Sequence, residues 1–264
     1  MSNSLGSGSF RYGAEACFFA KSAENFKATL STKDAEEFEN SRRDLVLRDL
    51  IGLQNQLLEK RSLMNMKRVQ RFLDGMNDLQ TVLEKLAFPA VDSVMACIWG
   101  PMRFFFKVVN VQYWAFDRIL DVYHRLGLST LPFRDYVNVF LASQNSIKCL
   151  LHTYEDVLKF HAAAYSLFSL RSELRTKLHR ATWKDLEPTF YHISSTLRLH
   201  KTCIEDHGSF LRRMGSGLDD PSGNDANRDL YNEFRAYELA YDESQKRFIE
   251  EEREQGFLLA LQGL

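Results

Sequence analysis

The spacing of apolar residues is the feature that most constrains the fold of this chain. Apolar side chains recur three and four positions apart over long stretches, as in Val69, Phe72, Leu73, Met76 and Leu79. This spacing places them on one face of an α-helix. Only five prolines and 13 glycines interrupt the 264 residues, and alternation with a period of two is scarce. The pattern predicts an all-α, multi-helix bundle with long antiparallel helices and a long charged C-terminal helix.

Prolines, glycines and capping residues set the expected helix boundaries. Ser31 or Thr32 is expected to cap the second helix, and Gly127 is expected to end the helix over residues 113–126. The Gly100-Pro101 pair predicts a kink, because Pro101 has no amide proton and its ring strains the preceding turn. The expected helices cover residues 14–30, 32–86 as one continuous pattern, 89–111, 113–126, 135–140, 144–170 and 181–211.

Composition divides the chain into four segments. Residues 1–13 form a Gly/Ser-rich tail that is expected to be disordered, and residues 14–213 form the helical bundle. The stretch 214–227 (MGSGLDDPSGNDAN) has the composition of a hinge loop. Residues 228–264 are predicted to form a highly charged connector helix. Its apolar face is thin, so this helix needs a partner within the fold or on another chain.

The charge balance and the cysteines bound the class of protein. The chain has 34 basic and 35 acidic residues, and this balance speaks against nucleic-acid binding. The cysteines lie far apart without a C-x-x-C pair, which favours reduced thiols and a cytoplasmic protein. The most apolar stretch, Leu86–Val111, carries Asp92, Arg103 and Lys107. Because such charges are costly inside a bilayer, we predict a buried core helix there. The cysteines are Cys17, Cys97, Cys149 and Cys203.

Neither a cofactor site nor a metal site is predicted. A phosphate-binding loop needs the pattern G-x-x-x-x-G-K-[ST], and the chain contains no such run. His200, Cys203 and His207 share one predicted helix face and are residue types that bind zinc. Residues seven apart on a helix are separated by about 10 Å, which is too far for them to share one ion unaided. We therefore expect a partly buried polar helix face.

Enzymatic activity is not predicted either. His152 lies near Glu155 and Asp156, and His161 lies near Lys159, so these side chains are of the types that carry out acid–base chemistry. No catalytic signature such as a nucleophile elbow or H-E-x-x-H accompanies them. Histidines beside acids are common on amphipathic helices, and no residue is assigned a catalytic role.

Large aromatic side chains are the candidates for core anchors and for contact with partners. Trp99 and Trp114 are expected in the core. Trp183 has the alternative of an exposed docking anchor. On the charged C-terminal helix, the thin apolar face consists of Leu230, Phe234, Tyr237, Tyr241 and Phe248. The candidate interaction residues are therefore Trp183, Tyr237, Tyr241 and Phe248.

Several motifs in a fixed order resemble a known family. They are the stretches Ile98–Met102 (IWGPM), Trp114–Phe116, Tyr154–His161, Arg180–Asp185 and Leu197–His200. Together they resemble the helical N-terminal domain, of unknown function, of fungal NACHT and ankyrin-repeat proteins. These belong to the signal-transduction ATPases with numerous domains, which are fungal analogues of NOD-like receptors. The resemblance covers roughly residues 34–264.

The resemblance implies a non-catalytic α-helical module ahead of a NACHT ATPase switch, which here would follow residue 264. Related modules act as effectors or adaptors in non-self recognition. We therefore expect protein partners: the NACHT module in cis, and a second copy or an adaptor in trans. The alternative is a membrane-active executioner that acts through residues 14–30, although Lys21, Glu24 and Lys27 oppose membrane insertion of that segment.

Overall fold

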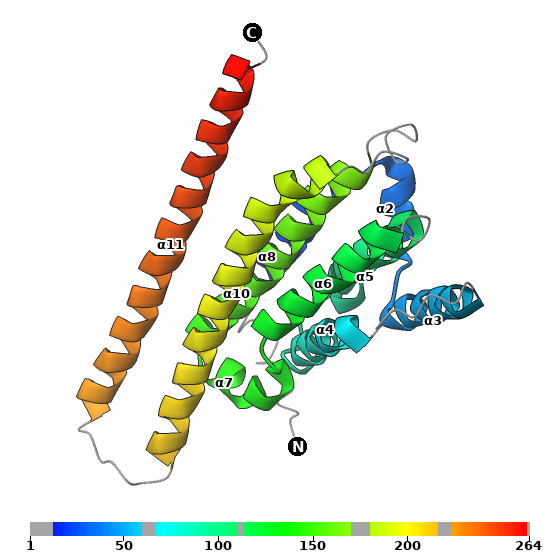
Figure 1. Cartoon of the computed structure of the whole chain (residues 1–264). Helices are drawn as coiled ribbons and strands as arrows, with labels where there is room; N and C mark the ends of the chain where they lie inside the picture. Colours follow the sequence, from blue (N-terminus) through cyan, green and yellow to red (C-terminus); the bar gives the residue numbers. More distant parts are fainter. Residues whose placement is uncertain (1–12, 60–66, 110–112, 170–179, 216–222, 263–264) are drawn as a thin grey trace, which may run out of the picture.

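The computed structural model describes residues 13–59, 67–109, 113–169, 180–215 and 223–262. Helices dominate all five ranges, and no strand occurs within them, so the predicted all-α bundle is confirmed (Figure 1). The elements are α1 (Gly13–Lys27), α2 (Thr32–Glu39), α3 (Arg43–Glu59), α4 (Lys67–Lys85), α5 (Val91–Val109), α6 (Tyr113–Ser129), η1 (Phe133–Tyr136), α7 (Val137–Ala142), α8 (Gln144–Ser169), α10 (Arg180–Gly215) and α11 (Gly223–Gln262).

Helix α5 is the central element of the core. It packs against α1, α2, α3, α4, α6 and α8, and Trp99, Met102 and Phe106 are almost completely buried. The predicted buried helix is therefore confirmed. It runs without interruption through Gly100 and Pro101, and the kink at this pair stays a prediction. A Cβ atom at Gly100 would lie 2.4 Å from Cγ of Phe38 on α2, so glycine is required here for close packing.

The continuous helix expected over residues 32–86 is wrong. Asn40 caps the end of α2, and its backbone N–H bonds to the carbonyl of Phe38. The next residue, Ser41, is buried and donates its hydroxyl to the carbonyl of Glu37 at 3.1 Å. Its oxygen also accepts a hydrogen bond from Arg103 at 3.3 Å. Such polar side chains compete with helical bonding and end the helix, so α3 begins separately at Arg43.

The prediction that Gly127 ends a helix is also wrong. Helix α6 continues through Gly127 to Ser129. A Cβ atom at Gly127 would lie 2.7 Å from the backbone nitrogen of Phe72 on α4. The glycine therefore allows α4 and α6 to approach closely, which is a different use of the residue from ending a helix.

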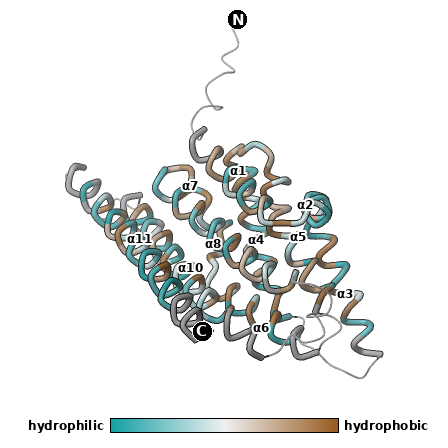
Figure 2. The backbone as a smooth tube through the Cα atoms, turned by 90° about the horizontal axis from the view of Figure 1, so that it is seen from above, coloured by the Kyte–Doolittle hydropathy of each residue, from teal (hydrophilic) through white to brown (hydrophobic). Residues whose placement is uncertain are grey.

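The C-terminal part of the chain forms a long helical hairpin. Helix α10 runs beside α8, and α11 returns along α10 at the edge of the bundle (Figures 1 and 2). The predicted long charged C-terminal helix is confirmed by α11. The expected loop at 214–227 is shorter, because α10 extends to Gly215 and α11 begins at Gly223. Residues 1–12, expected as a tail, and 216–222 lie outside the described part.

In the described residues, no helix combines the length and apolarity that crossing a bilayer requires. On α1, Phe19 and Phe26 are buried in the bundle, whereas Phe18 is exposed. The buried side chains face α5 and α8, the helices that α1 contacts. The aromatic face of α1 is therefore part of the core.

Candidate functional site: a polar seam under the C-terminal helix

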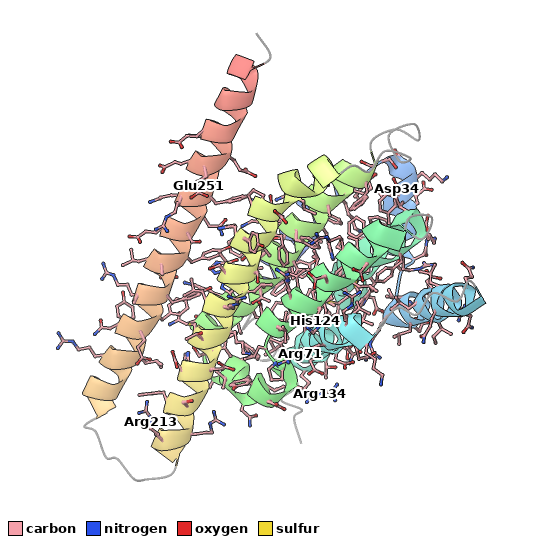
Figure 3. All side chains as sticks on the ribbon, in the orientation of Figure 1. Asp34, Arg71, His124, Arg134, Arg213 and Glu251 are labelled. Carbon is pink, nitrogen blue, oxygen red and sulfur yellow. The ribbon has the colours of Figure 1, made fainter. Side chains whose placement is uncertain are left out.

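Helix α11 meets the bundle along a row of polar and aromatic side chains rather than a broad apolar face. His152 and Asp156 are four residues apart on α8, and Tyr237 and Tyr241 are four residues apart on α11. Because residues four apart on a helix share one face, each pair lies on one face of its helix. Figure 3 shows side chains in the space between α11 and α10, while others on α11 point away from the bundle. We call the row the polar seam, and it consists of His152, Asp156, Lys159, His200, Tyr237 and Tyr241.

Asp156 is the centre of the polar seam and is fully buried. One carboxylate oxygen lies 3.0 Å from Nε2 of His200 on α10. The other accepts a hydrogen bond from the hydroxyl of Tyr241 on α11 at 3.1 Å and lies 3.3 Å from Nζ of Lys159. A buried carboxylate is stable only when such donors replace water. Asp156 therefore ties together α8, α10 and α11.

Burial and hydrogen bonding set the charges in the polar seam. Burial alone opposes ionisation of Asp156, but the hydrogen bond from His200 and the charges of His200 and Lys159 outweigh it. Together they lower the pKa of Asp156 to about 2. Burial, followed by the nearby charge of His200, lowers the pKa of His152 to about 4. At neutral pH the seam therefore holds a buried carboxylate beside a neutral His152 ring.

The hydroxyl of Tyr237 links the two histidines. Its oxygen lies 2.9 Å from Nδ1 of His200 and 2.8 Å from Nδ1 of His152. A hydroxyl group can donate one hydrogen bond and accept another. Tyr237 can therefore donate to one of the two histidines and accept from the other. The ring of His152 also stacks on Tyr241, with centroids 4.4 Å apart. These contacts fix α11 in one register on the bundle.

The seam continues along α11 on both sides of its centre. Lys148 on α8 pairs with Glu238 at 3.2 Å. Further along, the ring of Phe248 stacks on His192 of α10, with centroids 4.2 Å apart and an interplanar angle of 6°. Gln245 lies 3.1 Å from the same histidine. Contacts with the bundle therefore extend over several turns of α11.

The arrangement suits docking better than chemistry on a substrate. Both ring nitrogens of His200 and both carboxylate oxygens of Asp156 are engaged within the protein. A cavity of about 250 Å³ lies between α10 and α11, and Tyr237 lines it, but Asp156 and His200 do not. The seam therefore neutralises a buried charge and positions a helix. The absence of enzymatic activity stays a prediction.

The predicted interaction residues have an intramolecular use in this structure. Tyr237 and Tyr241 are buried in the polar seam, and Phe248 contacts α10. The thin apolar face of the C-terminal helix thus has a partner within the fold. Trp183 belongs to α10, but its side chain lies outside the described residues.

The candidate histidines for acid–base chemistry or metal binding lie in different parts of the structure and have different partners. His207 lies 3.0 Å from the hydroxyl of Ser146, apart from His200 in the seam. His161 does not pair with Lys159 but lies 3.1 Å from the hydroxyl of Tyr123 in the core. Within the described ranges, no group of three or more His, Cys, Asp or Glu side chains is placed to hold a metal ion.

The seam itself was missed from the sequence because its members are far apart along the chain. Asp156 and His200 are 44 residues apart, and periodicity gives no information on which helices pair.

Comparison of the chain with protein-family models, with curated proteins and with solved structures found no match.

Proposed function

We propose that this chain is a protein-interaction module in which α11 is the exchangeable element. It acts by self-association, when α11 leaves the polar seam of its own bundle and docks in the seam of a second copy. In line with the family resemblance of its motifs, we propose that it serves a fungal NACHT-type signalling protein and is not an enzyme. The observation that carries the proposal is the polar seam under α11.

The composition of the seam supports release of α11. Hydrogen bonds contribute little net stability when water replaces the lost partners, so a polar contact separates at lower cost than an apolar one. The described apolar contribution of α11 is small: its buried apolar side chains are Phe234, Tyr237 and Tyr241. Among the other α11 residues whose burial is described, Leu230, Glu238, Ser244, Gln245 and Phe248 are half-buried and the rest are exposed.

Connectivity also supports exchange between copies. Helix α11 packs mainly on α10, with further contacts to α8 through the seam. It follows α10 in sequence. Exchange of the same element between identical chains recreates the same contacts and is a low-cost route to dimers.

The Lys148–Glu238 ion pair across α8 and α11 allows a direct test. One full-length variant carries Lys148→Glu and the other carries Glu238→Lys, so each has like charges facing across the docked helix. When the two are mixed and exchange α11, both contacts become pairs of opposite charge. We expect the mixture to contain more dimer in sedimentation velocity than either variant alone.

The double variant Lys148→Glu/Glu238→Lys is the matched control, because it restores an ion pair within one chain. It should sediment as wild type does. If the mixture is no more dimeric than its components after prolonged incubation, exchange of α11 is ruled out as the means of self-association.

The membrane-active reading of α1 stays a prediction. It would require α1 to leave the core, because Phe19 and Phe26 are buried. A vesicle-leakage assay tests it: no release of dye at micromolar protein removes it.

A further inference from the structure

Two cysteines that are far apart in the sequence meet where α8 packs on α10. The Sγ atoms of Cys149 and Cys203 lie 3.3 Å apart, and both residues are free thiols. A disulfide bond is about 2.05 Å long, so the sulfurs need to approach by about 1.2 Å. Small rotations of the two side chains supply a movement of this size.

The surroundings of the two thiols differ. Cys149 is fully buried, and burial raises the pKa of its thiol well above the ordinary value. Cys203 is partly exposed and lines the cavity of about 250 Å³ between α10 and α11. A small oxidant in this cavity therefore meets Cys203 first, with Cys149 directly behind it.

We propose that Cys149 and Cys203 form an oxidation site, at which a small peroxide converts the thiol pair into an intramolecular disulfide. The sulfur of Cys203 attacks one peroxide oxygen; an S–O bond forms, the O–O bond breaks, and hydroxide takes the thiol proton and leaves as water. The sulfur of Cys149 then attacks the sulfenic sulfur of Cys203. The S–S bond forms, the S–O bond breaks, and the departing hydroxide takes the second proton.

The net result is oxidation of two thiols by two electrons and reduction of the peroxide to two waters. The new bond joins α8 to α10 directly beneath Tyr237, a residue that lines the same cavity. The cross-link closes a long loop, since the cysteines are 54 residues apart. Long loops give large stabilisation, and we expect the thermal midpoint to rise by about 10 °C. This inference does not depend on the proposed exchange of α11.

An equilibrium in glutathione buffers tests the geometry in the wild-type chain. The fraction of linked Cys149–Cys203 peptide is measured after equilibration of the folded protein and of the protein in concentrated urea. If the fold holds the thiols in position, the native protein should form the disulfide with an equilibrium constant at least about tenfold larger than the unfolded chain. An equal or smaller constant in the folded protein would overturn the proposal.

Peroxide treatment tests the chemistry, with Cys149→Ser as the variant and Cys97→Ser as the control. Cys97 is likewise buried, but it lies on α5. Wild type and Cys97→Ser should lose two hydrogens by intact mass, and the linked peptide should contain Cys149 and Cys203. Cys149→Ser should instead gain oxygen at Cys203. Wild-type protein that gains oxygen at Cys203 without losing hydrogens would refute the site, whether or not the variants fold.

Discussion

Replacement of Asp156 by asparagine removes the charge at the centre of the polar seam and preserves the volume of the side chain. The carboxylate accepts from Tyr241 at 3.1 Å and lies 3.0 Å from Nε2 of His200, and both contacts are buried. An asparagine has one acceptor oxygen, and its amide group presents hydrogens to the other donor. The Asp156→Asn protein therefore keeps at most one of the two buried hydrogen bonds in its present direction.

The expected loss in the free energy of unfolding is about 3 kcal/mol. A hydrogen bond to a charged group contributes about 1.5–3 kcal/mol, and breaking a buried ion pair costs about 3–5 kcal/mol. The contact with Lys159 adds little, because the lysine side chain is 47% exposed and its charge is screened by water. The lower end of the range for a buried ion pair applies, because the asparagine side chain retains one acceptor oxygen.

Urea denaturation at neutral pH, followed by circular dichroism, measures this loss. Asp242→Asn is the matched control, because it makes the same change at an exposed position on α11. It should change the free energy of unfolding by no more than about 0.5 kcal/mol. A loss below about 1 kcal/mol for Asp156→Asn would show that the buried carboxylate does not hold the three helices together.

Two further predictions concern glycine positions and the protonation of histidines. Gly100→Ala should lower the free energy of unfolding by about 2 kcal/mol, because the new Cβ would clash with Phe38. Gly52→Ala is the control, because the new Cβ meets nothing within 4 Å. It should raise the free energy of unfolding by about 0.5–1 kcal/mol. Urea midpoints compare the two, and equal effects would contradict the close packing at Gly100. Burial lowers the pKa of His152 to about 4 and that of His161 to about 3, from 6.5. The unfolded chain then binds more protons, so the stability from these neutral rings is present above pH 6.5 and is lost as the pH falls toward 4. Each ring contributes up to about 1.4 kcal/mol per pH unit to the slope of the free energy of unfolding against pH. Urea titrations at several pH values should show that His161→Gln removes the contribution of one ring. An unchanged slope would show that His161 is protonated in the folded protein.

The helical class of the fold was predictable because it depends on local periodicity. The spacing of Val69, Phe72, Leu73 and Met76 predicts a buried face, and all four side chains are buried on α4. Local signals were less reliable at helix ends. Gly127 resembles a terminating residue by type, but its use depends on the approach of another helix, which no local pattern contains.

The polar seam depends on tertiary pairing and was therefore largely beyond sequence reasoning. His152, His200 and Tyr237 come from three helices, and each looks ordinary on its own amphipathic helix. The same holds for Cys149 and Cys203, which sequence spacing separates and helix packing brings together.

Native-state hydrogen exchange of the full-length chain tests the central claim, which is that α11 is held by a polar seam and separates from an intact bundle. Amides between Phe234 and Tyr241 on α11 are compared with those of Leu150 to Phe160 on α8. The account predicts an opening free energy on α11 that is at least about 2 kcal/mol lower than on α8 but clearly above zero. Equal protection of both helices, with exchange only on global unfolding, would contradict it.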